Sequence, residues 1–260
     1  MGAPAAFLGH GSPMNAIEEN RYSAAWRRFG ESCSSPRAVL CISAHWFTNA
    51  SAVTAMAHPR TIHDFYGFPQ ELNDYRYPAP GSPELAEEVV ELLRPDVIEL
   101  DDSWGLDHGT WSVLTHAFPH ADVPVVQLAI NARQPFEYHM SVGRRLAALR
   151  DSGVVIVGSG NLVHNLGRLD WSAPNAAFDW AERFEATTRA VILGSPGEAA
   201  TLRDDPDYRM AAPTPEHFIP LLYFAALADE AAESAEVLVD GFAYGSISMT
   251  AFSLGMPALE

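Results

Sequence analysis

Four histidines occur in short segments that are rich in glycine, proline and small residues. The segments are FLGHGSP around His10, ISAHW around His45, SGNLVHN around His164 and PTPEHFIP around His217. Such surroundings are typical of places where a strand ends or a loop begins. Neutral imidazole is the commonest protein ligand for zinc, iron and copper, so imidazoles from four distant segments indicate a mononuclear metal site. We therefore expect a metalloenzyme.

Two of these histidines directly follow predicted strands. His10 lies between Gly9 and Gly11, and glycines on both sides let the backbone bend sharply and let a metal or substrate approach closely. A plain strand-to-loop turn with an incidental histidine is the alternative reading of this segment. His45 ends the apolar run VLCISAH, and ligands of open α/β sheets bind at the carboxyl ends of buried strands. We therefore expect both side chains at a pocket.

The other two histidines lie near predicted element boundaries. His164 follows the strand VVIVG in the segment GSGNLVHN, which lacks the third glycine and the later acidic residue of a dinucleotide-binding fingerprint. His217 precedes the apolar helical stretch FIPLLYFAAL. Thr214 is a candidate N-cap for that helix, which would hold the His217 side chain near the helix N-terminus.

Two further segments are candidates for the pocket. The segment LDHGT places His108 beside an acid and a glycine, before a helix. The segment TIHDFYGFP, which contains His63 and Tyr66, is an aromatic-rich loop of the kind that walls a pocket for an aromatic ligand. A hydrophobic loop anchored on the core is the alternative for this second segment. The remaining histidines are expected to be ordinary surface or core residues: His58, His116, His120 and His139.

Short apolar runs alternate with longer amphipathic stretches along the chain. Strands are predicted over residues 5–9, 38–43, 51–57, 97–100, 125–130, 154–158, 237–239 and 246–252. Helices are predicted from Pro83, with Ser82 as N-cap, from Pro135, and over residues 180–193 and 220–227. This alternation predicts an α/β fold with a central, mostly parallel or mixed sheet flanked by helices. Because no repeat or linker divides the chain, we expect residues 1–260 to form a single domain.

The composition restricts the partners and the compartment. The chain has 33 acidic and 16 basic residues, a formal net charge of −17 and no basic stripe, so neither nucleic acid nor an anionic membrane is an expected partner. The N-terminus lacks a signal-peptide pattern, and no apolar run approaches the roughly 20 residues that span a bilayer. A cytoplasmic location is therefore expected. Cys41 is predicted in the core and Cys33 in a loop, and a disulfide between them stays open.

Seven motifs, taken together, carry a family resemblance. They are GHGSPMN, SAHW, TIHDFYGFP, YPAPGSP, DHGTW, GSGNLVHNL and PTPEHFIPLLY, and they extend in this order from about residue 5 to residue 225. Each motif is weak by itself, whereas seven in register are specific. The sequence resembles the DOPA-dioxygenase type of class III extradiol ring-cleaving dioxygenases, which belongs to the superfamily of protocatechuate 4,5-dioxygenase.

The resemblance implies a single non-haem Fe(II) in a cleft at one edge of the sheet. His10, His45 and His217 match the family's metal ligands by position. In the protocatechuate branch the third ligand is a glutamate, so the choice between His217 and its neighbour Glu216 stays open. His164 matches the histidine that acts as acid and base, and in zinc-loaded members this residue approaches the metal as a fourth ligand.

The resemblance also implies the reaction. Dioxygen would open the aromatic ring of a DOPA-like catechol next to its two hydroxyls and give a muconic semialdehyde. Catechol loses protons as it binds, and His164 is the candidate base. His108 matches a second pocket histidine that contacts substrate or dioxygen. Zn(II) is expected to compete with iron for an all-imidazole site, because it lies above Fe(II) in the Irving–Williams order.

Two rival functions come from other classes. A zinc hydrolase would use the histidines and Glu216 to activate water, but the sequence has no HExxH helix and four imidazoles would close the site. A non-catalytic binding or signalling relative would be expected to lack a ligand or the acid/base, whereas all five candidate histidines are present. An iron-loaded sample that turns a catechol yellow separates the dioxygenase from both rivals.

Overall fold

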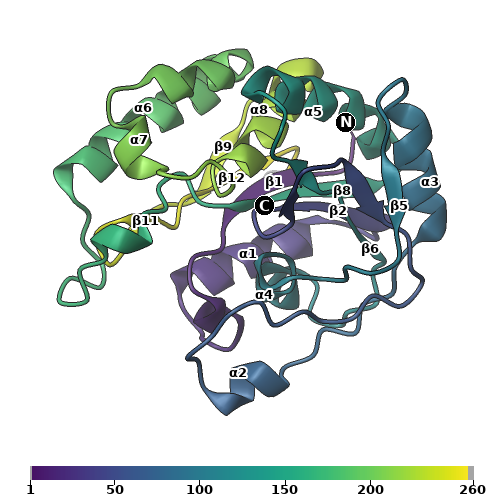
Figure 1. Ribbon diagram of the computed structural model, residues 1–260, viewed down its shortest axis with the longest axis horizontal. Helices are drawn as coiled ribbons and strands as arrows, with labels where there is room; N and C mark the ends of the chain where they lie inside the picture. Colours follow the sequence, from purple (N-terminus) through teal and green to yellow (C-terminus); the bar gives the residue numbers. More distant parts are fainter. Residues whose placement is uncertain (1, 257–260) are drawn as a thin grey trace.

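A six-stranded mixed sheet runs through the middle of the molecule in the computed structural model, which describes residues 2–256 (Figure 1). The strand order is β6 (Val125–Gln127), β2 (Ala38–Ser43), β8 (Val154–Gly160), β1 (Ala5–Gly9), β12 (Ala251–Leu254) and β9 (Glu236–Val239). The first four strands are mutually parallel, β12 is antiparallel to β1, and β9 is antiparallel to β12. The predicted α/β fold with a mostly parallel or mixed sheet is confirmed.

Helices cover both faces of this sheet (Figure 1). On one face lie α3 (Pro83–Leu92), α5 (Phe136–Asp151) and α8 (Ile219–Ala231), and on the other lie α1 (Arg21–Ser32) and α4 (His108–Ala117). The remaining helices are α2 (Gln70–Asp74), α6 (Asp179–Gly194), α7 (Tyr208–Ala211) and the 3-10 helices η1 (Pro13–Ala16), η2 (Leu166–Arg168) and η3 (Pro196–Asp204). The short strands are β3 (Phe47–Thr48), β4 (Ala52–Thr54), β5 (Glu99–Asp101), β7 (Ile130–Asn131), β10 (Phe242–Ala243) and β11 (Ile247–Ser248).

The continuous apolar runs of the central strands follow from burial on both faces. Along β1, Phe7 belongs to the core under α5 and α8, and the next residue, Leu8, belongs to the core under α1 and α4. Successive side chains of a strand point to opposite faces, so a strand between two helical layers has no solvent-facing position. All five residues of β1 and all six of β2 are accordingly buried.

Local sequence signals set several helix boundaries as predicted. The Ser82 hydroxyl accepts a hydrogen bond from the backbone N–H of Leu85 at 3.2 Å, and Pro83 occupies the first turn of α3. Pro135 is the residue before α5. The N-cap predicted for Thr214 is wrong, because α8 begins at Ile219, five residues further on, with Phe218 before it. The Thr214 hydroxyl instead donates a hydrogen bond to Glu216.

Several predicted strands are shorter or divided. The run over residues 51–57 pairs only at Ala52–Thr54, and the run over 125–130 divides into β6 and β7. The run over 246–252 likewise divides into β11 and the start of β12. In each case the apolar run continues past the point where the hydrogen-bonded pairing ends or changes partner. An apolar pattern does not reveal which strand each residue pairs with.

The structure describes the state of both cysteines and the lengths of the helices. Both cysteines are free thiols: Cys41 lies in the core in β2, and Cys33 lies in the loop directly after α1, as predicted, and is also buried. Among residues 2–256, no helix has the length and apolar character needed to cross a membrane.

Candidate metal centre and its cavity

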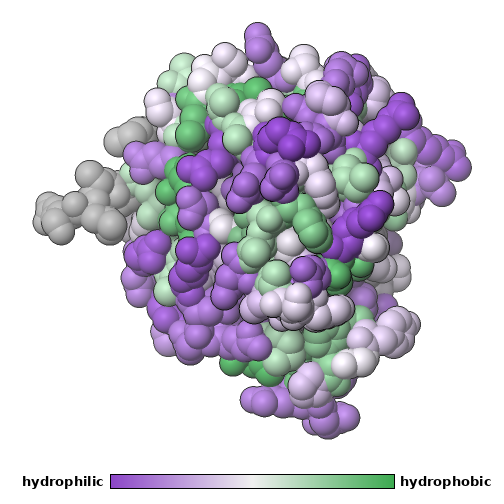
Figure 2. Space-filling view, turned by 90° about the vertical axis from the view of Figure 1, so that its left-hand side faces the viewer, coloured by the Kyte–Doolittle hydropathy of each residue, from purple (hydrophilic) through white to green (hydrophobic). Residues whose placement is uncertain are grey.

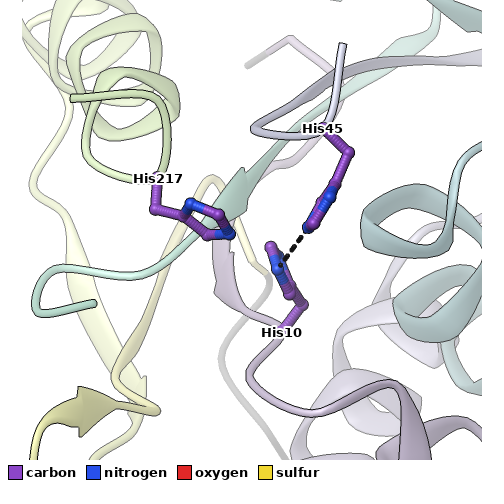
Figure 3. Close-up of side chains that lie close together, drawn as sticks. All are labelled: His10, His45 and His217. Atoms are coloured by element: carbon purple, nitrogen blue, oxygen red, sulfur yellow. Dashed lines mark hydrogen bonds between the residues drawn. The ribbon is translucent and has the colours of Figure 1, made fainter. Parts of the chain in front are cut away.

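Three of the predicted ligands converge at the carboxyl edge of the parallel strands. His10 follows β1, His45 comes two residues after β2, and His217 precedes α8 (Figure 3). One side-chain nitrogen from each lies within 4.8 Å of the other two. The Nε2 atoms of His10 and His45 are 3.2 Å apart. Residues 207 positions apart in the chain therefore offer nitrogen atoms to one small volume.

Close backbone contacts bring the His217 segment to this edge. The backbone N–H of Asn161, which follows β8, donates a hydrogen bond to the His217 carbonyl at 2.9 Å. A Cβ atom on Gly160 would lie 2.2 Å from that carbonyl oxygen, so only glycine allows this approach. The backbone N–H of His10 bonds to the Gly160 carbonyl at 3.1 Å. The glycine-rich end of β8 therefore ties together segments that are far apart in the sequence.

Oxygen atoms bind the Nδ1 side of all three rings. His10 Nδ1 lies 3.0 Å from the Ser159 hydroxyl, and this hydroxyl donates its own hydrogen to the Gly109 carbonyl at 2.5 Å. The Ser159 oxygen can therefore only accept from His10, which places the proton on Nδ1. His45 Nδ1 lies 3.0 Å from an Asp64 carboxylate oxygen, which can only accept. In both rings, Nε2 is left with a lone pair.

His217 follows the same pattern. Its Nδ1 lies 3.3 Å from Glu216 Oε1. Glu216 therefore orients His217 from behind, which leaves His217 Nε2 toward the other two rings (Figure 3). Carboxylate, hydroxyl or carbonyl partners on the far nitrogen are the usual arrangement of histidines that bind a metal.

This donor set fits a metal ion. Two unprotonated nitrogens 3.2 Å apart repel each other unless a cation lies between them. Nitrogens bound to one metal at about 2.1 Å, with angles between about 90° and 109°, are about 3.0 to 3.4 Å apart. The separation of His10 and His45 falls in this range. Imidazole nitrogen suits zinc, iron, copper and nickel rather than calcium or magnesium.

Burial keeps the His10 and His217 rings neutral. Burial is the largest cause that lowers the pKa of His10 and of His217 well below the usual value, and repulsion from the neighbouring histidines lowers it further. A neutral imidazole is the form that binds a metal, because protonation occupies the lone pair. The cluster is therefore prepared for a cation at neutral pH.

His164 lies against this group from one side. Its ring is parallel to that of His217, with ring centroids 3.5 Å apart. Burial, followed by the nearby His45, lowers the pKa of His164 to about 4. His164 lies close to His217 and Glu216, whereas the group that contains His10 and His45 does not include it. Its service as a fourth metal ligand stays a prediction.

Asp64, which the sequence analysis did not single out, links two histidines. Its Oδ2 accepts from His45 Nδ1 at 3.0 Å, and its Oδ1 accepts from His108 Nδ1 at 3.0 Å and from the His108 backbone N–H at 3.0 Å. Burial would raise the pKa of Asp64, but the hydrogen bonds from His108 and His45 outweigh burial and hold it well below the usual range. The only signal in the sequence was its place inside the aromatic loop.

A second buried carboxylate, that of Asp107, fixes the start of the helix to which His108 belongs. Asp107 is the N-cap of α4, and its Oδ1 accepts from the backbone N–H of Thr110 at 3.1 Å and from the Ser43 hydroxyl at 2.6 Å. Its Oδ2 accepts from the Gln127 amide at 2.7 Å. Because these partners come from α4, β2 and β6, they fix the start of α4 and with it the His108 ring.

The histidines form the floor of a cavity of about 470 Å³. Its lining includes all five candidate histidines together with Asp64, and its remaining side chains are mostly apolar. The apolar and aromatic lining residues are Pro13, Met14, Phe65, Phe68, Leu166, Leu169, Trp171, Tyr244 and Ile247. The size is typical of cavities that hold a small organic molecule.

The other histidines lie elsewhere. His63 Nε2 lies 2.9 Å from the Tyr75 carbonyl, and His63 is not among the cavity-lining residues. His116 and His139 are buried in the core, where they hydrogen-bond to the Asn15 carbonyl and the Tyr223 hydroxyl. His58 and His120 are exposed. Both interpretations of the aromatic loop apply, because Phe65 and Phe68 line the cavity and also pack on the core, whereas Tyr66 points to solvent at 95% exposure.

The family is decided by a match over nearly the whole described chain. Residues 4–255 match the family described as the catalytic LigB subunit of aromatic ring-opening dioxygenase. The chain belongs to this family. The predicted resemblance to extradiol dioxygenases is therefore confirmed, and the metal-centred interpretation of the cavity agrees with it.

Individual relatives are similar over most of their length. The chain is 46% identical over 257 residues to an Escherichia coli K12 protein named 4,5-DOPA dioxygenase extradiol, covering 97% of this chain and 94% of the relative. It is 36% identical over 226 residues to a Beta vulgaris protein of the same name, covering 83% of each chain. A crystal structure of an uncharacterized Escherichia coli K12 protein has a TM-score of 0.85 at 41% identity, covering 97% of this chain and 100% of the other.

Proposed function

We propose that this chain is an extradiol dioxygenase that opens the aromatic ring of a catechol with dioxygen at one non-haem Fe(II). The observation that carries the proposal is the convergence of His10, His45 and His217, with their Nδ1 atoms bound to oxygens, on the floor of a largely apolar cavity. Membership of the ring-opening family and the 4,5-DOPA dioxygenase relatives support it.

The three histidines would hold the iron and leave part of its coordination sphere free. When bound there, iron would supply redox chemistry and a template for the catechol and dioxygen. Glu216 and Asp64 would keep His217 and His45 in the tautomers that this requires. In this assignment His217 binds the metal, and Glu216 orients it.

His164 would accept a proton from the catechol as a general base. The ring lines the cavity beside His217, and burial lowers its pKa to about 4, so that it is neutral at neutral pH and offers a lone pair to the proton. The same group would return the proton as the ring opens. Its parallel contact with His217 fixes the ring plane, so the accepting nitrogen has a defined position.

His108, whose ring centroid lies 3.8 Å from that of His45, would contact the substrate or dioxygen. Asp64 holds the proton of His108 on Nδ1, which leaves Nε2 for the cavity. Phe65 packs edge-on against this ring, with centroids 5.6 Å apart, and shields it from solvent. A hydrogen bond in such a shielded place is stronger than the same bond in water.

The proposal is tested by anaerobic reconstitution with Fe(II), followed by air and a panel of catechols that includes L-DOPA. We expect a yellow ring-opened semialdehyde and one dioxygen consumed for each catechol, read by absorbance and by an oxygen electrode. A zinc-loaded sample serves as control and is expected to stay colourless, because zinc has no redox chemistry. No colour and no oxygen uptake with any catechol, while iron is bound, would contradict the proposal.

A further inference from the structure

The upper walls of the cavity have a different chemistry from its floor. One wall comes from Phe65 and Phe68 of the loop before α2, whose rings pack edge to face with centroids 5.3 Å apart. Another part of the lining comes from the segment that follows η2 and from β11, with Leu169, Trp171 and Ile247. A substrate whose catechol oxygens reach the histidines therefore places its ring substituent among apolar side chains.

The mouth of this cavity is exposed and hydrophobic. Leu166 and Trp171 line it and are 59% and 72% exposed. Trp171 packs against Tyr244 with ring centroids 4.8 Å apart. Figure 2 views the molecule from the side of α6, α7 and β11, and hydrophobic residues gather along the middle and lower part of that face between hydrophilic ones. Exposed apolar surface that continues into a cavity marks a binding surface for apolar groups.

Positive charge is missing from the cavity walls. The sequence contains no lysine, so its 16 basic residues are all arginines. Among the described residues that line the cavity, none is an arginine. The carboxylate of Asp64 lies on the floor, and the whole chain has a net charge of −17. A carboxylate on the substrate would find no cationic partner on these walls and an unfavourable overall field.

We propose that the substrate is a catechol whose ring substituent is uncharged and apolar, such as an alkyl or aryl group, rather than an amino-acid or acid side chain. This inference rests on the proposed function and adds the substrate class. It departs from the substrate in the relatives' names, because DOPA carries both a carboxylate and an ammonium group on its substituent. The apolar walls would bind the substituent through its hydrophobic area.

The expected size of the preference follows from the transfer of apolar groups out of water. Each methylene buried between the walls is expected to raise kcat/KM by about fourfold. Extending 4-methylcatechol to 4-propylcatechol, which adds two methylenes, should therefore give roughly a fifteenfold increase. A carboxylate that must enter the same space without a partner is expected to lower kcat/KM by about tenfold or more.

The decisive experiment compares an acid with its own methyl ester. The pair is 3-(3,4-dihydroxyphenyl)propanoate and its methyl ester, which share the ring and the linker but differ in charge. We expect the iron-loaded protein to show a kcat/KM, read by oxygen uptake, that is at least about tenfold higher for the ester. Equal values, or a preference for the acid or for L-DOPA, would overturn the inference.

A designed reversal sharpens the test. Leu169→Arg places a cation on the wall and is expected to raise the acid-to-ester ratio of kcat/KM several-fold, whereas Leu193→Arg, on the exposed side of α6 and outside the lining, adds the same charge without changing the ratio. Arg168, which is exposed in η2 between Leu166 and Leu169, is the alternative partner for a carboxylate. A preference for the acid that disappears in Arg168→Gln would overturn the inference and assign that role to Arg168.

A binding measurement separates this inference from the proposed function. Calorimetric titration of the zinc-loaded protein with the ester and the acid reports the preference without any turnover. Tighter binding of the ester together with no oxygen uptake by the iron form would support the substrate class and contradict the dioxygenase proposal. Ring cleavage of the acid and the ester at equal rates, with equal affinities, would support the dioxygenase proposal and contradict the substrate class.

Discussion

The molecule buries histidines in two regions, at the sheet edge and in the helical layer. His139 of α5 is fully buried and hydrogen-bonds through Nδ1 to the Tyr223 hydroxyl at 2.9 Å, much as His10 is buried and bonds to Ser159. Burial is the first cause of a lowered pKa in both. Only His10 shares a small volume with other ligand atoms, since His139 belongs to none of the potential metal-binding groups among residues 2–256. Convergence of lone pairs, rather than burial or pKa, therefore distinguishes a site from a core.

The largest expected effect follows from removing one converging nitrogen. His10→Ala should lower the affinity for Fe(II) or Zn(II) by well over 100-fold, because loss of a direct ligand exceeds the roughly 10- to 100-fold cost of losing a supporting group. The affinity is measured by competition with a chelator and the stoichiometry by atomic emission. His139→Phe is the matched control and should bind metal like the wild type. Equal metal loss in both variants would contradict the distinction between the two regions.

The next effect separates metal binding from proton transfer within the sheet-edge region. His164→Ala should keep the metal affinity within about an order of magnitude and lower the rate of ring cleavage by about 10²- to 10⁴-fold, the usual contribution of a positioned acid/base. Rates are compared at full iron loading and across pH. His63→Ala, outside the cavity lining, should retain the wild-type rate. A fully active His164→Ala would show that another group carries the proton.

A smaller effect tests the support behind the ligands. Asp64→Asn replaces one accepting oxygen by an NH₂ group that faces the N–H of His45 or His108, so one ring must turn. We expect about a 10- to 100-fold lower metal affinity with little change in the unfolding midpoint of the metal-free protein. Unchanged metal affinity would reduce Asp64 to a packing role. A large fall in the stability of the metal-free protein would show that Asp64 mainly stabilises the fold of its loop.

Local signals explain why much of the site could be predicted from the sequence. His10 and His45 follow strands whose apolar runs and glycine or small-residue ends are visible in the sequence, and parallel strands bring such ends to one edge. Asp64 has no such signal. Its position depends on how the loop folds over α4, and the neighbouring His63, equally conspicuous in the sequence, bonds to the Tyr75 carbonyl instead. Side-chain direction within a loop is set by tertiary contacts that no local pattern encodes.

The apolar walls were predictable only in part. The composition of the aromatic loop indicates a pocket wall that contains Phe65 and Phe68, because aromatic residues cluster there within a few positions. Trp171 lies in a polar stretch that carries no periodic pattern, and it reaches the cavity because the chain after η2 returns toward Tyr244. The N-cap predicted at Thr214 is absent for a related reason: threonine is a favourable N-cap residue type, but the helix begins five residues later.

The smallest expected effect concerns the helical layer and is a pH dependence of stability. Burial lowers the pKa of His139 to about 4, below its ordinary value of 6.5. The unfolded chain therefore takes up a proton before the folded one as the pH falls. The stability contributed by a neutral His139 is complete above about pH 6.5, decreases below it and is lost by about pH 4. Lowering the pH from 7 to 5.5 should cost about 1 kcal/mol through this group.

His139→Phe isolates this contribution, because the clustered histidines titrate in both proteins and cancel in the difference. Urea unfolding of the two proteins at pH 7 and pH 5.5 gives four free energies of unfolding. The wild type should lose about 1 kcal/mol more than the variant between the two pH values. Equal losses would show that His139 is as easily protonated in the folded state as in the unfolded chain. Burial of the His139 side chain would then not be sufficient to keep it neutral, in contrast to the sheet-edge cluster.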